Sequence, residues 1–191
     1  MFNKNLKNPP NKYRPAPFWS WNEKLTVEET VRQVREMEEV GIGGYFMHAR
    51  GGLQTEYMSD EWFDNVKATV REGKKLGMES WGYDENGWPS GFGSGAVNGL
   101  GLKYQQKYIR CEETDAPKTQ DDTIINVPYD GKNIHFYYDV NPFYVDTLDG
   151  EVISEFIRIT HKAYKDTLGD EFPDIAGFFT DEPQISRNGY P

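Results

Sequence analysis

Residues 44–50 read Gly-Tyr-Phe-Met-His-Ala-Arg, a short apolar run that ends in two polar side chains. An apolar run that begins at glycine and ends in polar residues is typical of a buried strand whose carboxyl end reaches the surface. Apolar residues recur at helical spacing on both sides of it, over residues 27–37 and residues 62–73. A buried strand between two amphipathic helices predicts an α/β fold, and His48 and Arg50 mark the end of that strand.

The two flanking helices carry their own start and stop signals. Thr26 followed by Glu29 forms a capping box before the first helix, and Ser59 is the N-cap residue expected before the second. Gly41 and Gly77 stand where the two helical patterns stop.

The alternation of strands and helices extends along most of the chain. A third helix opens at Asp149 and stops near Gly169. Such alternation indicates parallel strands joined by crossover helices. We therefore expect a four-stranded parallel sheet in which the strands lie side by side in chain order, with helices on the outer face. The strands are predicted at residues 18–21, 43–50, 78–85 and 174–183.

Residues 104–138 break this alternation. The segments "KYQQKYIRCEE", "DTIINVP" and "KNIHFYYD" are typical of short antiparallel strands, and a turn at Tyr129-Asp130-Gly131 joins the last two. We interpret residues 104–138 as a small β-insertion between the third parallel strand and its helix, within one domain over residues 1–191.

Every predicted parallel strand ends in polar side chains. In (β/α) barrels and open α/β sheets, sites form at the carboxyl ends of the strands. Polar ends that recur in phase on four strands therefore predict a pocket at this edge of the sheet. The side chains at these ends are Asn22, His48, Arg50, Asp84, Glu85, Asp181 and Glu182.

Carboxylates and aromatic rings at one edge favour carbohydrate chemistry. Hydrolysis of a glycosidic bond requires two carboxyl groups, one acting as acid and the other as base or nucleophile. Because Asp181 and Glu182 point to opposite faces of a strand, at most one of them faces the centre of the pocket. The predicted sugar contacts, which include tryptophan rings able to stack on a sugar, are Trp19, Trp21, Asn22, His48, Arg50, Trp88 and Asp181.

Other interpretations remain open for the same residues. A metal-dependent hydrolase would use His48, Asp84 and Asp181, since imidazole and carboxylate oxygens are suitable ligands. A non-catalytic carbohydrate-binding domain would present an aromatic platform with no buried carboxylate beside it. The tryptophans on the strands are also compatible with a purely structural role in the core.

The composition excludes several classes of protein. A net charge of −10, with no local cluster of basic residues, argues against a nucleic-acid partner. No stretch approaches the ~18 apolar residues of a membrane span, and residues 1–15 lack the apolar run of a signal peptide. The single cysteine, Cys111, rules out an internal disulfide. We therefore expect a soluble, cytoplasmic protein.

The glycosidase interpretation requires no cofactor and no resident metal. Nucleotide-binding fingerprints of the Walker and dinucleotide types are absent from the sequence. The glycine-rich stretch "GFGSG" at residues 91–95 follows "NGWPS" instead of a strand that opens directly into a helix, so it is a weak match to a phosphate-binding loop.

Four stretches that carry these features resemble a known enzyme family. "PFWSWNEKLTVEET", "GIGGYFMHARGGLQTEYMSDEW", "GMESWGYDENGWPSGFGSG" and "FFTDEP" are similar to the catalytic-barrel segment of bacterial glycoside hydrolases of the α-L-rhamnosidase family 106. The resemblance runs from about Pro15 to Pro183. It implies a (β/α)₈ barrel that acts on glycosides, with catalytic acids at strand ends and a deoxyhexose such as rhamnose as the leading substrate.

The resemblance also suggests catalytic residues. "TDEP" is similar to the Asn-Glu-Pro motif of the large retaining glycosidase clan, in which the glutamate is the acid/base; this implies that Glu182 is the general acid. Asp181 stands where that clan has asparagine, so the asparagine's contact with a sugar hydroxyl and the retaining outcome do not carry over. Asp84 and Glu85 are the further catalytic candidates.

A (β/α)₈ barrel needs eight strands, and only four are predicted here. We therefore expect the first four β/α units of such a barrel, with the second catalytic carboxylate in the other half. The chain alone is then expected to be inactive, or active only when it is paired with a second half-barrel. The inner, apolar face of the sheet and its two edges would then be open, which favours association with the missing half of the barrel or with a second copy of the chain.

Overall fold

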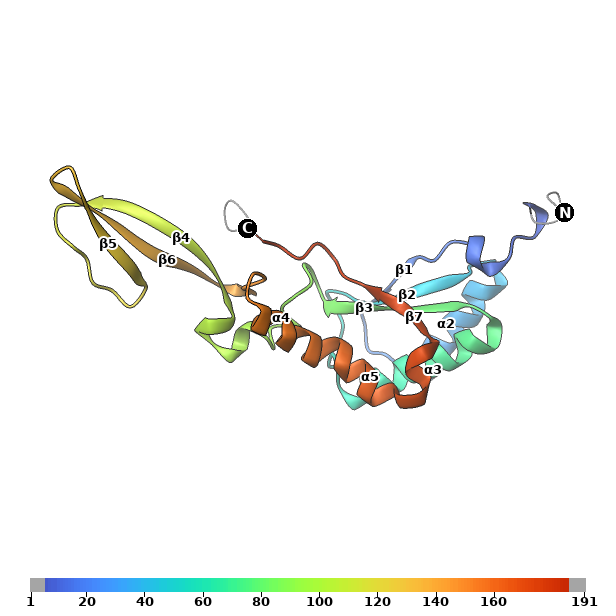
Figure 1. Ribbon diagram of the computed structural model, residues 1–191. Helices are drawn as coiled ribbons and strands as arrows, with labels where there is room; N and C mark the ends of the chain where they lie inside the picture. The colour runs from blue at the N-terminus through green and yellow to red at the C-terminus, as the bar shows by residue number, and fades with distance from the viewer. Residues whose placement is uncertain (1–5, 186–191) are drawn as a thin grey trace.

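The computed structural model describes residues 6–185 and has a mixed α/β architecture with two separate sheets (Figure 1). The first sheet is parallel and has the strand order β1-β2-β3-β7, which is the predicted chain order. The second is antiparallel and has the order β4-β6-β5. The parallel strands are β1 (Phe18–Trp21), β2 (Gly44–Ala49), β3 (Glu79–Asn86) and β7 (Ile175–Phe179).

The first two long helices begin where the sequence signals place them. Helix α2 (Val27–Glu39) starts after Thr26, whose side chain accepts the backbone N–H of Glu29. Helix α3 (Asp60–Leu76) starts after Ser59. It ends at Gly77, whose left-handed backbone conformation (φ 68°) is easily reached by glycine. Within the described residues, no helix is both long and apolar enough to cross a membrane.

The third predicted helix begins at Asp149 but is not uniform. It consists of α4 (Gly150–Ile157), a π-helical turn over Arg158–Lys162, and α5 (Ala163–Leu168). A short 3₁₀ segment over Gly169–Asp174 then leads into β7. Further 3₁₀ turns lie at Asn11–Tyr13, Asn98–Leu100 and Leu102–Tyr104.

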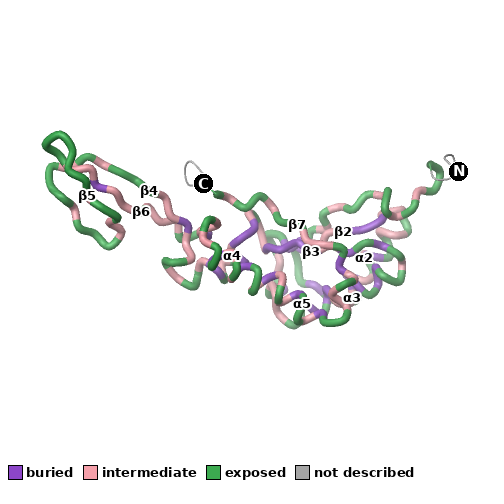
Figure 2. Tube along the Cα trace, in the orientation of Figure 1, coloured by how far each residue is buried: buried purple, intermediate pink, exposed green. Residues whose placement is uncertain are grey.

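The main core lies between one face of the parallel sheet and the helices. Trp21, Tyr45 and Met47 point from the sheet toward Val66 and Val70 of α3, and all five are buried. The Tyr45 hydroxyl donates to a backbone carbonyl of α3 at 2.8 Å, which ties the helix to the sheet. Figure 2 shows buried residues concentrated in the parallel sheet and its helices, whereas the antiparallel sheet is mostly exposed or half-buried.

The other face of the parallel sheet is aromatic, and no helix within residues 6–185 covers it. Phe18 lies 4.9 Å from Phe179 and 5.2 Å from Phe46, and Phe46 lies 5.3 Å from Trp81, all between ring centroids. Phe18 and Phe179 remain 49% and 37% exposed. We call this surface the open face, and its members are Phe18, Phe46, His48, Trp81, Tyr83, Phe179 and Asp181.

The antiparallel sheet extends away from the rest of the molecule (Figure 1). Its strands are β4 (Gln105–Thr114), β5 (Thr123–Tyr129) and β6 (Lys132–Val145), with the predicted turn at Asp130-Gly131 between the last two. Strand β6 continues beyond the predicted insertion boundary at residue 138. Its last residues, Tyr144 and Val145, are buried in a second apolar cluster with Val152 and Phe156 of α4.

The contact between β3 and β7 is tested by substitution of Gly82. A Cβ atom at this position would lie 2.4 Å from the Phe178 ring, which fills the space that a side chain would need. We expect Gly82→Ala to lower the free energy of unfolding by about 1–3 kcal/mol, because the ring must shift in a packed core. Denaturant unfolding measures this. Gly99→Ala, where nothing lies within 4 Å, is the control; equal losses in both variants would contradict the packing described.

Candidate functional site

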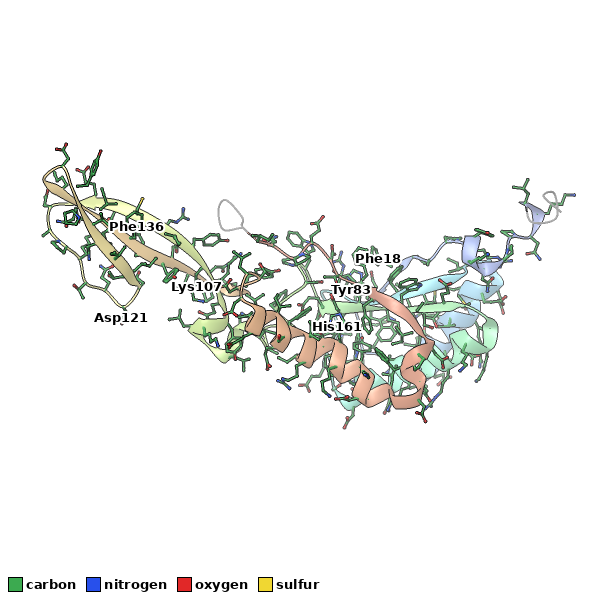
Figure 3. All side chains as sticks on the ribbon, in the orientation of Figure 1. Phe18, Tyr83, Lys107, Asp121, Phe136 and His161 are labelled. Atoms are coloured by element: carbon green, nitrogen blue, oxygen red, sulfur yellow. The ribbon has the colours of Figure 1, made fainter. Side chains whose placement is uncertain are left out.

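Strand alternation divides the predicted site residues between the two faces of the parallel sheet. His48 and Asp181 lie on the open face, together with Tyr83, which is not among the predicted site residues. Trp21 and Asp84 lie on the side that faces the helices. Figure 3 shows the same division, with Phe18 and Tyr83 on one side of the sheet and His161 on the helix side.

His48, Tyr83 and Asp181 form a contact cluster at the carboxyl ends of β2, β3 and β7; we call it the open-face cluster. The ring centroids of His48 and Tyr83 are 3.7 Å apart. The Tyr83 hydroxyl donates to Asp181 Oδ2 at 2.6 Å. Phe18 borders His48 at 5.2 Å and Phe179 stacks on Tyr83 at 6.0 Å, so aromatic rings surround the polar groups.

His48 has unused hydrogen-bonding capacity. Its side chain is 2% exposed, and neither ring nitrogen has a hydrogen-bond partner among the described residues. Burial, reinforced by the nearby positive charge of Arg50, lowers the pKa of His48 to about 4. The imidazole is therefore neutral at pH 7 and offers one donor and one acceptor. Buried polar atoms without partners are costly, which makes His48 a candidate contact for a ligand or a water molecule.

Tyr83 acts as a donor in this cluster. Burial and the hydrogen bond to Asp181 raise the pKa of Tyr83, so the phenol keeps its proton across the physiological range. Its hydroxyl also lies 3.2 Å from the carbonyl oxygen of Gly87. The bond from Tyr83 is made to one oxygen of the Asp181 carboxylate, Oδ2.

Trp19 and Trp21, two of the predicted substrate contacts, lie on the helix side of the sheet and line a small pocket there together with Asn22. Trp21 is buried and packs against the Trp62 ring at 4.9 Å, and the Trp19 indole N–H donates to Gln33 of α2 at 2.7 Å. The cause is strand parity: Phe18 of β1 occupies the open face, so Trp19 and Trp21 point toward the helices. Exposed Asn22 lines a small pocket between β1 and α2, away from the open-face cluster.

Asp84, a predicted catalytic residue, also lies on the helix side of the sheet. Its carboxylate is fully buried and accepts hydrogen bonds of 2.6 Å from the hydroxyls of Ser90 and Thr180. His161 Nε2 lies 3.4 Å from Asp84 Oδ2. The metal alternative fails for the same reason, because Asp84 points away from His48 and Asp181. No group of three potential ligands converges among the described residues.

Glu85, the other predicted catalytic acid, organises the loop that follows β3. Its buried carboxylate accepts five backbone N–H groups at 2.5–3.2 Å, from Asn86, Gly91, Phe92, Gly93 and Ser94. Burial raises the pKa of Glu85, and these N–H donors oppose that effect. The glycine-rich stretch at 91–95 therefore does wrap an anion, as glycine-rich loops do, but the anion is a side chain of the same protein.

Three further predicted site residues, Glu182, Arg50 and Trp88, are exposed and follow strands β7, β2 and β3 along the chain. Glu182 follows Asp181 directly, is exposed, and has a left-handed backbone conformation (φ 44°). Arg50 is exposed just past the end of β2, and its charge reaches His48. Trp88, 40% exposed, is carried by the loop that Glu85 organises.

Comparisons with known proteins give little further information. No family model and no curated protein matches the chain. One similar solved structure is that of a rhamnosidase from Novosphingobium sp. PP1Y, with 26% identity and a TM-score of 0.49. The similarity covers 60% of this chain and 11% of that chain.

The buried, neutral state of His48 predicts a pH dependence of stability. Its folded-state pKa of about 4 lies below the unfolded value of about 6.5, so the unfolded chain binds more protons between these limits. Stability is therefore present above pH 6.5 and is lost as the pH falls toward 4. Between pH 7 and pH 4.5, we expect the free energy of unfolding of His48→Phe to fall by about 2 kcal/mol less than that of the wild type. Denaturant unfolding at both pH values measures it; an identical loss in both proteins would contradict a buried neutral His48.

Proposed function

We propose that the open-face cluster belongs to the substrate site of a glycoside hydrolase. The observation that carries this proposal is the position of His48, Tyr83 and Asp181 at the carboxyl ends of three parallel strands, on the face that no helix of the described part of the chain covers. A neutral imidazole, a phenol and a carboxylate can bind sugar hydroxyls, and aromatic rings can contact the C–H faces of a sugar. The resemblance of the motifs to rhamnosidase-type barrels supports the same class.

We propose that the parallel sheet forms the first four β/α units of a (β/α)₈ barrel. The parallel strands lie in chain order, helices cover one side, and the polar cluster is at the carboxyl ends, as in such barrels. The open face then corresponds to the barrel interior. The exposed rings of Phe18 and Phe179 and the outer strands β1 and β7 favour association with further barrel strands, from another segment or from a second copy.

In this proposal Glu182 is the general acid. It lies beside Asp181, which with Tyr83 and His48 would hold hydroxyl groups of the sugar. Phe18 and Phe179 provide an apolar surface for the methyl group of a deoxyhexose, which supports an α-L-rhamnoside as the first substrate to test. A non-catalytic sugar-binding domain fits less well, because a carboxylate stands directly beside the aromatic surface.

Turnover of aryl glycosides tests the proposal. We expect hydrolysis of an aryl α-L-rhamnoside only from an oligomer or complex that completes the barrel, and none from the monomer; light scattering on the same sample establishes which species is active. Glu182→Gln should lower kcat/KM at least 100-fold, because general acid catalysis contributes about 10²–10⁴-fold. Asp181→Asn should lower it about 10-fold or more through lost hydrogen bonds to the substrate.

The matched control is Glu39→Gln, which removes an exposed carboxylate at the end of α2. It should leave turnover unchanged. Turnover by Glu182→Gln within twofold of the wild type would contradict the acid assignment. Absence of turnover on every aryl glycoside, in every oligomer, would contradict the proposed function.

A further inference from the structure

Glu182 has a backbone conformation that its residue type disfavours. Its φ of 44° places it in the left-handed region, where a side chain with a Cβ atom is strained. Such strain persists only when the surrounding structure fixes the backbone, and it recurs at functional sites. The hydrogen bonds on either side of Glu182 show what fixes it.

The residue before Glu182 is held by Ser90. The Asp181 N–H donates to Ser90 Oγ at 2.8 Å, and the Ser90 N–H donates to the Asp181 carbonyl oxygen at 2.8 Å. Ser90 is fully buried, so water does not compete for these bonds.

Ser90 is oriented in turn by Asp84. The single hydroxyl proton of Ser90 is donated to Asp84 Oδ1 at 2.6 Å, so a lone pair of Oγ faces the Asp181 N–H. The other carboxylate oxygen of Asp84 accepts the hydroxyl of Thr180 at 2.6 Å. Asp84 therefore joins β3, the loop after it and the end of β7.

The chain after Glu182 is held by Tyr144, near the end of β6. The Tyr144 hydroxyl accepts the Gln184 N–H at 3.0 Å and donates to the Ser90 carbonyl oxygen at 2.6 Å. The Thr147 hydroxyl donates to the Gln184 carbonyl oxygen at 2.6 Å. Both sides of Glu182 are thus connected through one buried residue, Ser90.

We infer that Asp84, Ser90 and Tyr144 are positioning residues that hold the backbone on both sides of Glu182 and so fix the direction of its carboxylate. We call these three residues the Glu182 clamp. Its importance for catalysis rests on the proposed function, whereas its effect on the backbone does not. The experiments below separate the two.

Amide hydrogen exchange on the full chain tests the hydrogen bonds directly. Ser90→Ala should speed exchange of the Asp181 amide at least 10-fold, and Tyr144→Phe should do the same for the Gln184 amide. Tyr57→Phe is the matched control, because it removes a buried hydroxyl that has no partner among the described residues. Unchanged exchange at both amides would overturn the clamp.

A double-mutant cycle tests whether the clamp maintains the strain. Glu182→Gly should raise Tm in the wild-type background, because glycine adopts a positive φ without strain. In Tyr144→Phe the backbone can relax, so the same change should raise Tm by less than half as much. The cycle uses Tyr144→Phe because Ser90→Ala would remove a hydrogen-bond donor to Asp84. The test therefore does not depend on whether Ser90→Ala folds. An equal rise in both backgrounds would overturn the inference.

Kinetics then test the catalytic consequence. Tyr144→Phe should lower kcat at least 10-fold and leave KM within threefold, since a misdirected acid affects the reaction more than the binding of substrate. An unchanged kcat would overturn the catalytic part of the inference. A wild-type protein without turnover would contradict the proposed function instead, and the exchange and stability measurements would still decide whether the clamp exists.

Discussion

The buried carboxylate of Asp84 is the constraint on which the structure at the carboxyl ends of the parallel strands depends. Leaving such a buried polar group without partners would cost about 1–3 kcal/mol, so the hydroxyls of Ser90 and Thr180 are required around it. Those two residues belong to the loop after β3 and to the chain after β7. Their hydrogen bonds to one carboxylate hold the two segments together. On the helix side, His161 of the π-helical turn lies 3.4 Å from the same carboxylate.

The composition of the open face follows from the alternation of side chains along each strand. Because Asp84 and Thr180 point toward the helices, their neighbours Tyr83 and Asp181 point the other way and meet at 2.6 Å. His48 reaches the same place from β2. Residues that support the fold therefore alternate along single strands with residues on the open face. Glu85 extends the structural role into the loop that carries Trp88.

Local signals made most of the fold predictable from the sequence. Thr26, Ser59 and Asp149 cap helices as predicted, because capping depends on a few neighbouring atoms. The strand order was predictable because crossover helices restrict it. The π-helical turn at Arg158–Lys162 has no comparable local signal and was not predicted. The sequence also does not determine which face of each strand the helices cover, so it does not predict that Trp19, Trp21 and Asp84 lie on the helix side.

The account's central claim is that the open face binds a sugar, and an NMR titration with methyl α-L-rhamnoside tests it most directly. The account predicts saturable shifts of the His48 imidazole resonances and of the Tyr83 and Asp181 amides, with much smaller shifts at Trp21 on the helix side. Shifts confined to the antiparallel sheet or to the helix side, with the His48 resonances unmoved at saturation, would contradict it.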